Sequence, residues 1–304
     1  MIFLLAALGL IGGGIWLYAP DKPRAELEAH YAQPPSEFLM VAGMRMHVRD
    51  TGPRDAPPVI LLHGLGSSLL TWEPWARALS YTHRVIRYDL PGFGLTGPDP
   101  TGDYFDTRSI AVLAALMDTL SIKRASLVGN SMGGRLAWMF ALEHPDRVDR
   151  LVLISPDGFA SPEFAYGKKP EVPAVAEVLR YTLPTVVLRM TLEPAYGDDK
   201  RLTPETVQRY RDMILAPGVR KALLDRTEQV MIEPPEPLLR HVQAPTLLVW
   251  GEKDGFIPYR NAGDYLAAMP NARLLVFPDL GHVPMEEAPA RSLAPVEAFL
   301  DGSL

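Results

Sequence analysis

The sequence predicts an α/β fold built on a mostly parallel sheet, and two observations lead to this prediction. From residue 37 onward, short apolar runs typical of buried strands alternate with stretches of helical pattern. Residues 157–236 interrupt this alternation with proline-punctuated helical patterns and no clear strand. We therefore expect an eight-stranded sheet with helices on both faces and a helical cap inserted after the sixth strand.

The expected strands follow one another along the chain, with helices between them. The first two form a hairpin about Gly43, at residues 38–42 and 44–49. Buried parallel strands are expected at residues 59–62, 85–88, 126–128, 151–154, 246–250 and 274–277. Helical patterns mark residues 110–120, 135–143 and 293–300, and the last of these closes the domain.

The N-terminal segment lies outside this alternating pattern. Residues 1–19 contain no charged residue and are long enough to cross a bilayer as one helix. We expect them to be an uncleaved membrane anchor, with a cleaved export signal as the alternative. Lys22 and Arg24 follow this span and no basic residue precedes it, which favours a cytoplasmic catalytic domain. The remaining expected divisions are a linker at 20–36, a core at 37–156 and 237–304, and a cap at 157–236.

Composition and charge exclude several classes of function. The 304 residues carry a net charge of −6 and no long basic run, so no nucleic-acid partner is expected. The absence of cysteine excludes disulfides, thiolate metal ligands and a cysteine nucleophile. Residues 92–97 match G-x-G-x-x-G, but Pro98 and Pro100 follow where a dinucleotide-binding fold needs a helix. Because no H-E-x-x-H or P-loop pattern occurs either, we expect neither a metal nor another cofactor.

A G-x-S-x-G pentapeptide, Gly129-Asn130-Ser131-Met132-Gly133, lies between an expected strand and an expected helix. In that context the pattern predicts a nucleophile elbow, a sharp turn from which the serine hydroxyl projects. The flanking glycines are needed because such a turn packs backbone against backbone. Ser131 would also stand at a helix N-terminus, whose free N–H groups can stabilise a developing negative charge.

A nucleophilic serine requires a base, and the base requires an acid that orients it. Of the seven histidines, His282 follows the expected last strand and would lie over the same sheet edge as the elbow. Asp254 stands just beyond the preceding strand, which gives the chain order serine, aspartate, histidine. Asp157 is the rival acid, although it also suits the role of a turn or cap residue.

A second glycine-rich loop, His63-Gly64-Leu65-Gly66, ends the third expected strand. Glycine at these positions lets the backbone approach a substrate. The N–H groups of Leu65 and Met132 could therefore pair as an oxyanion hole. We interpret His63 as a residue that orients this loop and not as the base.

Taken together, these motifs resemble the α/β-hydrolase superfamily over residues 37–302, and the segment 89–94 matches it as well. The resemblance implies that Ser131 is the nucleophile, His282 the general base and acid, and Asp254 the orienting acid. It also implies an oxyanion hole formed by the two backbone N–H groups named above. An apolar N-terminus followed by a capped domain looks most like membrane-anchored hydrolases of the monoacylglycerol-lipase type.

The expected activity is hydrolysis of carboxylic esters through an acyl-enzyme on Ser131. Serine at the elbow argues against the dehalogenases and epoxide hydrolases of this superfamily, which carry aspartate there. Many aromatic and methionine residues in the expected cap favour an apolar acyl pocket. The expected partners are therefore an apolar small-molecule acyl ester and a membrane, to which residues 1–19 attach the protein.

Two alternatives stay open. Hydrolases of carbon–carbon bonds in meta-cleavage products share the Gly-Asn-Ser-Met-Gly-Gly run found at 129–134. This chain departs from them in lacking a Pro-Gly after residue 66 and in carrying Val283 where they usually have an aromatic residue. Arg180 and Arg189 could bind a substrate carboxylate, which would favour this alternative. The other alternative is a non-catalytic ligand receptor on the same fold.

Overall fold

The computed structural model describes residues 18–160, 165–168 and 174–303 of the chain. Its centre is an eight-stranded sheet in the order β1-β2-β4-β3-β5-β6-β7-β8. The strands are β1 (Ser36–Val41), β2 (Met44–Thr51), β3 (Pro58–Leu62), β4 (Arg84–Tyr88), β5 (Ala125–Asn130), β6 (Val148–Ile154), β7 (Thr246–Gly251) and β8 (Ala272–Phe277). Each corresponds to a strand expected from the sequence, so the predicted sheet is confirmed.

The sheet is mixed at one edge only. β2 pairs antiparallel with β1 and β4, whereas the five other pairings are parallel. The hairpin turns at Ala42 and Gly43, whose φ angles of 50° and 85° are both positive. Such a turn matches the right-handed twist of the strands that it joins. The parallel strands end at a common edge, and open α/β sheets bind their ligands at that edge.

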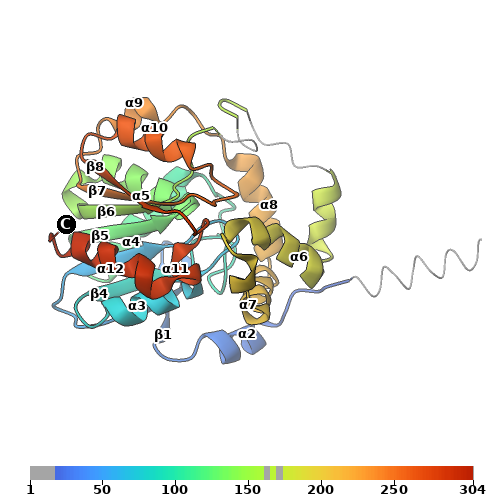
Figure 1. Cartoon of the computed structure of the whole chain (residues 1–304). Helices are drawn as coiled ribbons and strands as arrows, with labels where there is room; N and C mark the ends of the chain where they lie inside the picture. Colours follow the sequence, from blue (N-terminus) through green and yellow to red (C-terminus); the bar gives the residue numbers. More distant parts are fainter. Residues whose placement is uncertain (1–17, 161–164, 169–173, 304) are drawn as a thin grey trace, which may run out of the picture.

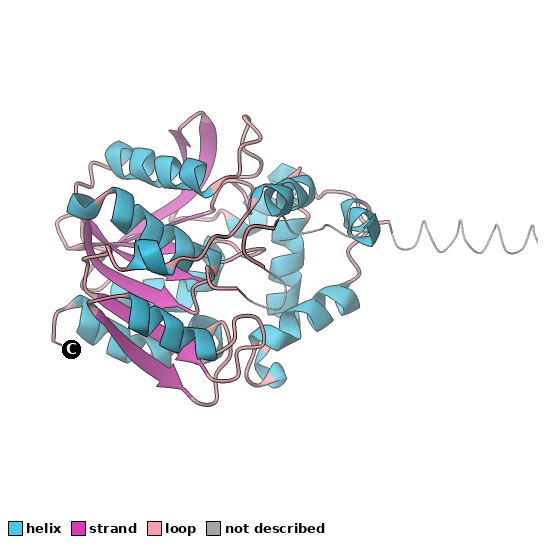
Figure 2. Cartoon of the chain, turned by 90° about the horizontal axis from the view of Figure 1, so that it is seen from above, coloured by secondary structure: helices cyan, strands magenta, loops and turns pink. Residues whose placement is uncertain are grey.

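Helices cover both faces of the sheet (Figure 2). Residues of β3 to β8 are divided between two separate hydrophobic clusters, one on each face, whereas β1 and β2 contribute to the first cluster and not to the second. Helices α4 (Asp106–Thr119), α5 (Met132–Glu143) and α10 (Arg260–Ala268) join the first cluster, and α3 (Glu73–Leu79) and α12 (Pro289–Leu300) join the second. β5 and β7 are buried along their whole length, which is why their sequences are continuous apolar runs.

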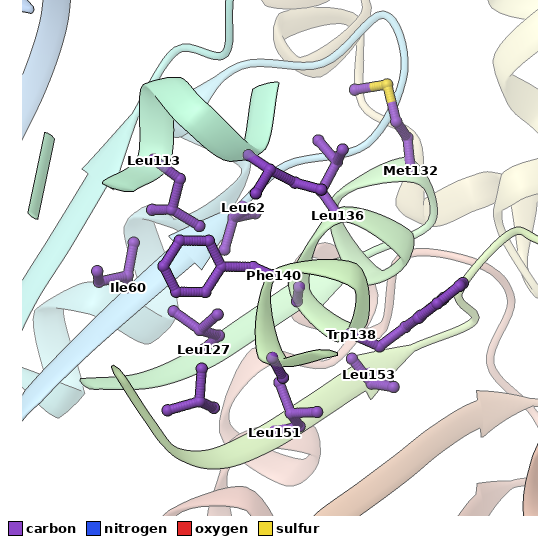
Figure 3. Packing of buried hydrophobic residues seen from close by; sticks show 14 of the residues in the cluster. Ile60, Leu62, Leu113, Leu127, Met132, Leu136, Trp138, Phe140, Leu151 and Leu153 are labelled. Atoms are coloured by element: carbon purple, nitrogen blue, oxygen red, sulfur yellow. The ribbon is translucent and has the colours of Figure 1, made fainter. Parts of the chain in front are cut away.

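Helix α5 is fixed to the sheet close to the elbow. Figure 3 shows Leu136 and Phe140 among the strand residues Leu62 and Leu127, while Met132 lies at the rim of the cluster. Leu136 is 2% exposed and Phe140 is fully buried. Burying each such side chain stabilises the fold by about 1.5–3 kcal/mol. The packing therefore holds the first turn of α5, and with it the elbow, against the sheet.

Between β6 and β7 the described residues form helices and loops. These are η3 (Ala174–Arg180), α6 (Thr185–Leu192), η4 (Glu193–Ala195), η5 (Asp199–Arg201), α7 (Pro204–Ile214), α8 (Val219–Gln229) and α9 (Glu236–Leu239), where η marks a 3₁₀ helix. α7 begins at Pro204 because the Thr203 hydroxyl accepts a hydrogen bond from the N–H of Thr206 at 3.2 Å. α6, α7 and α8 lie together at one end of the sheet (Figure 1). They form the cap expected after the sixth strand, whose boundaries at 157–236 stay a prediction.

The segment expected as a linker, residues 20–36, is instead partly helical and packed. It contains α2 (Arg24–Tyr31), whose Leu27 is only 1% exposed. The N–H of Lys22 donates to the carbonyl of Leu215, and Asp21 forms an ion pair with Arg220 of α8 at 2.5 Å. Charged residues at the start of this segment thus attach it to the cap.

The expectation of a membrane-associated protein with a single N-terminal span is corrected. Among the residues that the structure describes, no helix is both long enough and apolar enough to cross a bilayer. Residues 1–17, which make up most of the expected span, lie outside the described part of the chain. The described N-terminal residues begin with Tyr18, which pairs through an isolated bridge with Thr182 of the cap.

Candidate active site

Ser131 stands in a sharp turn between β5 and α5. Its φ of 54° lies in the left-handed region, which a non-glycine residue rarely adopts and which costs backbone strain. A Cβ on Gly129 would lie 2.2 Å from the carbonyl oxygen of Gly133, and one on Gly133 would lie 2.2 Å from that of Leu62. Only glycine fits at either position. The surrounding backbone therefore holds Ser131 in this geometry.

His282 and Asp254 meet beyond the carboxyl ends of β8 and β7. The ring Nδ1 of His282 lies 2.8 Å from Oδ2 of Asp254, and both residues are buried. The other oxygen, Oδ1, accepts hydrogen bonds from the N–H groups of Phe256 and Ile257 at 2.8 and 2.9 Å. The carboxylate is thus fixed from both sides. With Nδ1 donating to it, Nε2 is the ring nitrogen left to exchange a proton.

The rival acid, Asp157, lies elsewhere. Its Oδ1 is 3.0 Å from Nε of Arg135, and its N–H donates to the carbonyl of Ser131 at 3.3 Å. Burial raises the pKa of Asp157 above its ordinary value, against the opposing charge of Arg135. Asp157 therefore contacts the backbone of the elbow, whereas Asp254 contacts the imidazole.

Asn130 connects the elbow to the histidine loop. Its Nδ2 donates to the carbonyl of His282 at 2.9 Å and to that of Ile154 at 3.2 Å, and the residue is 3% exposed. On its other side lies Gly64, where a Cβ would approach the Cβ of Ser131 to 3.2 Å. The elbow, the histidine loop and the loop after β3 therefore converge on one point.

The loop at residues 63–66 is held by its own histidine. Nε2 of His63 accepts a hydrogen bond from the N–H of Leu90 at 3.0 Å, and Nδ1 donates to the carbonyl of Gly64 at 2.8 Å. Burial lowers the pKa of His63, which has no exposed surface. A neutral ring with its proton on Nδ1 satisfies both hydrogen bonds. Leu65, at the tip of this loop, is half exposed.

A pocket of about 30 Å³ lies beside the elbow. Leu65 and Met132 line it from the core. Arg135 and Asp157 add charged groups, and Arg226 and Thr227 of α8 line it from the cap together with Val230, which follows that helix. The two residues expected to form the oxyanion hole thus face one space. Within the described residues, no group of three or more His, Asp or Glu side chains could hold a metal ion.

The cap also contacts the histidine loop. The N–H of His282 donates to the carbonyl of Ala195 at 2.7 Å, and a Cβ on Gly281 would lie 2.4 Å from that oxygen. Glu286, in α11 (Pro284–Glu287), accepts hydrogen bonds from the hydroxyl of Tyr196 at 2.5 Å and from Arg209. No local pattern marks these contacts, because the partners lie far apart in sequence.

Two arginines expected as possible carboxylate ligands are already paired. Arg180 binds Glu177 at 2.5 Å, and Arg189 binds Glu193 at 3.0 Å, each within one helical turn. The cap instead contributes a different, buried arginine to the pocket, Arg226, which no sequence pattern marks.

A family model described as the alpha/beta hydrolase fold matches residues 57–289. The chain belongs to the α/β-hydrolase family. A 2-hydroxy-6-oxononadienedioate/2-hydroxy-6-oxononatrienedioate hydrolase from Comamonas testosteroni is 32% identical to this α/β hydrolase over 253 residues, covering 80% of this chain and 86% of the relative. A 2-hydroxy-6-oxo-6-phenylhexa-2,4-dienoate hydrolase from Burkholderia cepacia is 30% identical over 250 residues, with the same coverages of 80% and 86%.

Solved structures show the same similarity. A meta-cleavage product hydrolase from Pseudomonas fluorescens matches this α/β hydrolase with a TM-score of 0.76 at 27% identity, covering 88% of this chain and 98% of that one. A membrane phospholipase A, a bacterial virulence factor, matches with a TM-score of 0.76 at 25% identity, covering 99% and 97%. The curated relatives overturn the expected carboxylic-ester activity, because they are named as hydrolases of 2-hydroxy-6-oxo acids.

Proposed function

We propose that this α/β hydrolase cleaves a carbon–carbon bond in 2-hydroxy-6-oxo-dienoates, the meta-cleavage products on which its relatives act. The observation that carries the proposal is the lining of the pocket beside Ser131. Most of its surface is apolar, Arg135 and Asp157 pair with each other at 3.0 Å, and Arg226 adds a buried cation without an ion-pair partner among the described residues. Such a pocket suits a largely apolar substrate that carries a negative charge.

In this proposal Ser131 attacks carbon 6 of the substrate after a proton has moved from the 2-hydroxyl group to carbon 5. His282 accepts the serine proton, and Asp254 holds the imidazole in the required tautomer. The backbone N–H groups of Leu65 and Met132 donate to the oxyanion that forms on carbon 6.

Collapse of this intermediate breaks the bond between carbons 5 and 6. The electron pair passes through the conjugated chain to the oxygen on carbon 2. That oxygen takes the proton from His282, and the fragment leaves as a 2-hydroxydienoate. The remaining acyl group stays on Ser131. Water then gives a proton to His282 and attacks the acyl carbon, which releases a carboxylic acid and restores the serine.

The test compares two substrate classes on the purified full chain. We expect the absorbance of 2-hydroxy-6-oxo-6-phenylhexa-2,4-dienoate to decay with wild type and to persist with Ser131→Ala. Ser303→Ala, at the exposed C-terminal end, is the matched control and should keep wild-type activity. Turnover of p-nitrophenyl esters that depends on Ser131, with no turnover of dienoates, would overturn the proposal.

A further inference from the structure

Among the described residues of the cap, Arg226 is the most deeply buried cation. It projects from α8, is 1% exposed, and ranks among the largest fully buried side chains. Its Nη2 donates to the hydroxyl of Ser109 at 3.2 Å and to the carbonyl of Pro91 at 3.5 Å. Nε and Nη1 have no hydrogen-bond partner among the described residues. An arginine presents five N–H donors, so a part of its capacity is unused.

The nearby carboxylates belong to a different arginine. Arg135 lies 3.3 Å from Asp106 and 3.0 Å from Asp157, and takes both as ion-pair partners. None of the ion pairs formed by the described residues includes Arg226. Burial lowers the pKa of Arg226 to about 10, so the group still carries its charge at neutral pH. An unpaired buried charge is costly, and proteins keep such groups where a ligand completes the pair.

Arg226 lies at the pocket in which the proposed reaction would take place. It lines the same pocket of about 30 Å³ as Leu65 and Met132. A space of that size holds about two water molecules or one carboxylate group. The rings of Phe93 and Tyr104 lie 5.4 and 5.7 Å from the guanidinium carbon. These rings restrict its orientation and limit its contact with water.

We propose that Arg226 binds a carboxylate of the substrate and so makes negative charge a requirement for productive binding. This inference rests on the proposed function, since it assigns the charged end of that substrate to a residue. The carboxylate has two possible sources. One is carbon 1 of every 2-hydroxy-6-oxo acid, and the other is the far end of a dioate such as the substrate named for the Comamonas testosteroni relative.

Arg226→Gln removes the charge and leaves a shorter polar side chain. With a charged hydrogen bond lost, we expect KM to rise about 10- to 100-fold and kcat to change less. The two substrates compared are 2-hydroxy-6-oxo-6-phenylhexa-2,4-dienoate, which has one carboxylate, and a 2-hydroxy-6-oxo dioate, which has two. A rise in KM for both substrates assigns Arg226 to the carboxylate at carbon 1. A rise for the dioate alone assigns it to the far carboxylate. Unchanged KM for both substrates overturns the inference.

Arg220→Gln is the matched control, because Arg220 is another buried arginine of α8 and pairs with Asp21. It should leave KM unchanged, and Arg226→Lys should retain part of the affinity. Thermal melting of each variant without ligand separates loss of binding from loss of fold.

A second measurement does not depend on turnover. In a Ser131→Ala background, calorimetric titration with benzoate and benzamide compares an anion with a neutral molecule of the same shape. We expect Arg226→Gln to weaken benzoate about tenfold or more and to leave benzamide unchanged. If dienoates are not substrates but this difference appears, the proposed reaction fails while the anion site stands. Equal benzoate binding by both proteins overturns the anion site itself.

Discussion

The side-chain amide of Asn130 donates a hydrogen bond of 2.9 Å to the carbonyl oxygen of His282. The residue before the proposed nucleophile therefore fixes the backbone of the proposed base, although 152 positions separate the two in the sequence. The same amide also donates to the carbonyl of Ile154, so both of its protons are used inside the core. One buried side chain thus sets the relative position of two loops.

Asn130→Asp should disturb this arrangement. A carboxylate has no N–H to donate and would face two carbonyl oxygens, leaving both acceptors unsatisfied. We expect the free energy of unfolding, measured with urea, to fall by about 3 kcal/mol and kcat to fall more than KM changes. Asn271→Asp is the control, since its amide donates to the carbonyl of Gln243 at the surface, where water can replace it. Equal losses of unfolding free energy in the two variants would contradict a stabilising role for the buried hydrogen bonds of Asn130.

Asp254→Asn should impair turnover while keeping the fold. Its amide oxygen can still accept from Phe256 and Ile257, which places the NH₂ group against Nδ1 of His282. His282 would then accept at Nδ1 and carry its proton on Nε2, the wrong nitrogen for a base. We expect kcat on a dienoate to fall on the order of 10³- to 10⁴-fold, with melting temperature almost unchanged. Activity within a few-fold of wild type would remove Asp254 from the proposed mechanism.

The elbow glycines should not tolerate a methyl group. Gly133→Ala would bring Cβ within 2.2 Å of the Leu62 carbonyl, so we expect destabilisation by about 3 kcal/mol or more. Gly263 of α10 is the matched control, since a Cβ there meets nothing within 4 Å. Gly263→Ala should stabilise the protein by about 1 kcal/mol, because alanine has the higher helix propensity. The denaturant midpoint should be lower than that of wild type for Gly133→Ala and higher for Gly263→Ala.

His63 should make the fold sensitive to acid. Its folded pKa lies below the ordinary value of 6.5, so the unfolded chain binds more protons between the two values. The free energy of unfolding is then fully maintained above pH 6.5 and falls as the pH drops below it, by up to about 1.4 kcal/mol per pH unit. Protonation of Nε2 also removes the hydrogen bond from Leu90 and releases the loop that carries Leu65.

The measurement is urea unfolding from about pH 7.5 to about pH 5, on wild type and His63→Gln. The difference between the two proteins isolates this histidine from the six others. We expect the pH slope in this range to be smaller in the variant. Parallel slopes would show that His63 does not carry the acid sensitivity.

The elements that sequence could predict are those whose signal is local. Buried parallel strands such as β5 and β7 are continuous apolar runs because both of their faces are covered. Their positions can therefore be predicted from the sequence alone. The sequence signal of the elbow is equally local. Its glycines are required because a Cβ there would clash with the backbone of the pentapeptide or of the neighbouring strand. Asp254 and His282 followed from their places after two strands that end at one edge.

The features that sequence could not predict depend on distant partners. Arg226 looks like any cap arginine until α8 places it against Ser109, 117 residues away. The proline-rich and charged composition of residues 20–36 predicts a linker, and only the burial of Leu27 against the rest of the chain reveals that α2 is packed. The choice between an ester and a carbon–carbon bond failed for a related reason. Both reactions use one elbow, and the pocket beside it is assembled from core and cap residues that lie far apart in the sequence.

The hydrogen bond from the N–H of His282 to the carbonyl of Ala195 has a consequence for how this enzyme could change its substrate. The cap is the natural place for insertions and exchanges that alter specificity. Here, however, an exchange that shifts residue 195 would also shift the imidazole. Divergence is therefore easier by single substitutions on α8, which leave that carbonyl in place. A cap transplanted from a relative should work only if it arrives with a carbonyl at this point.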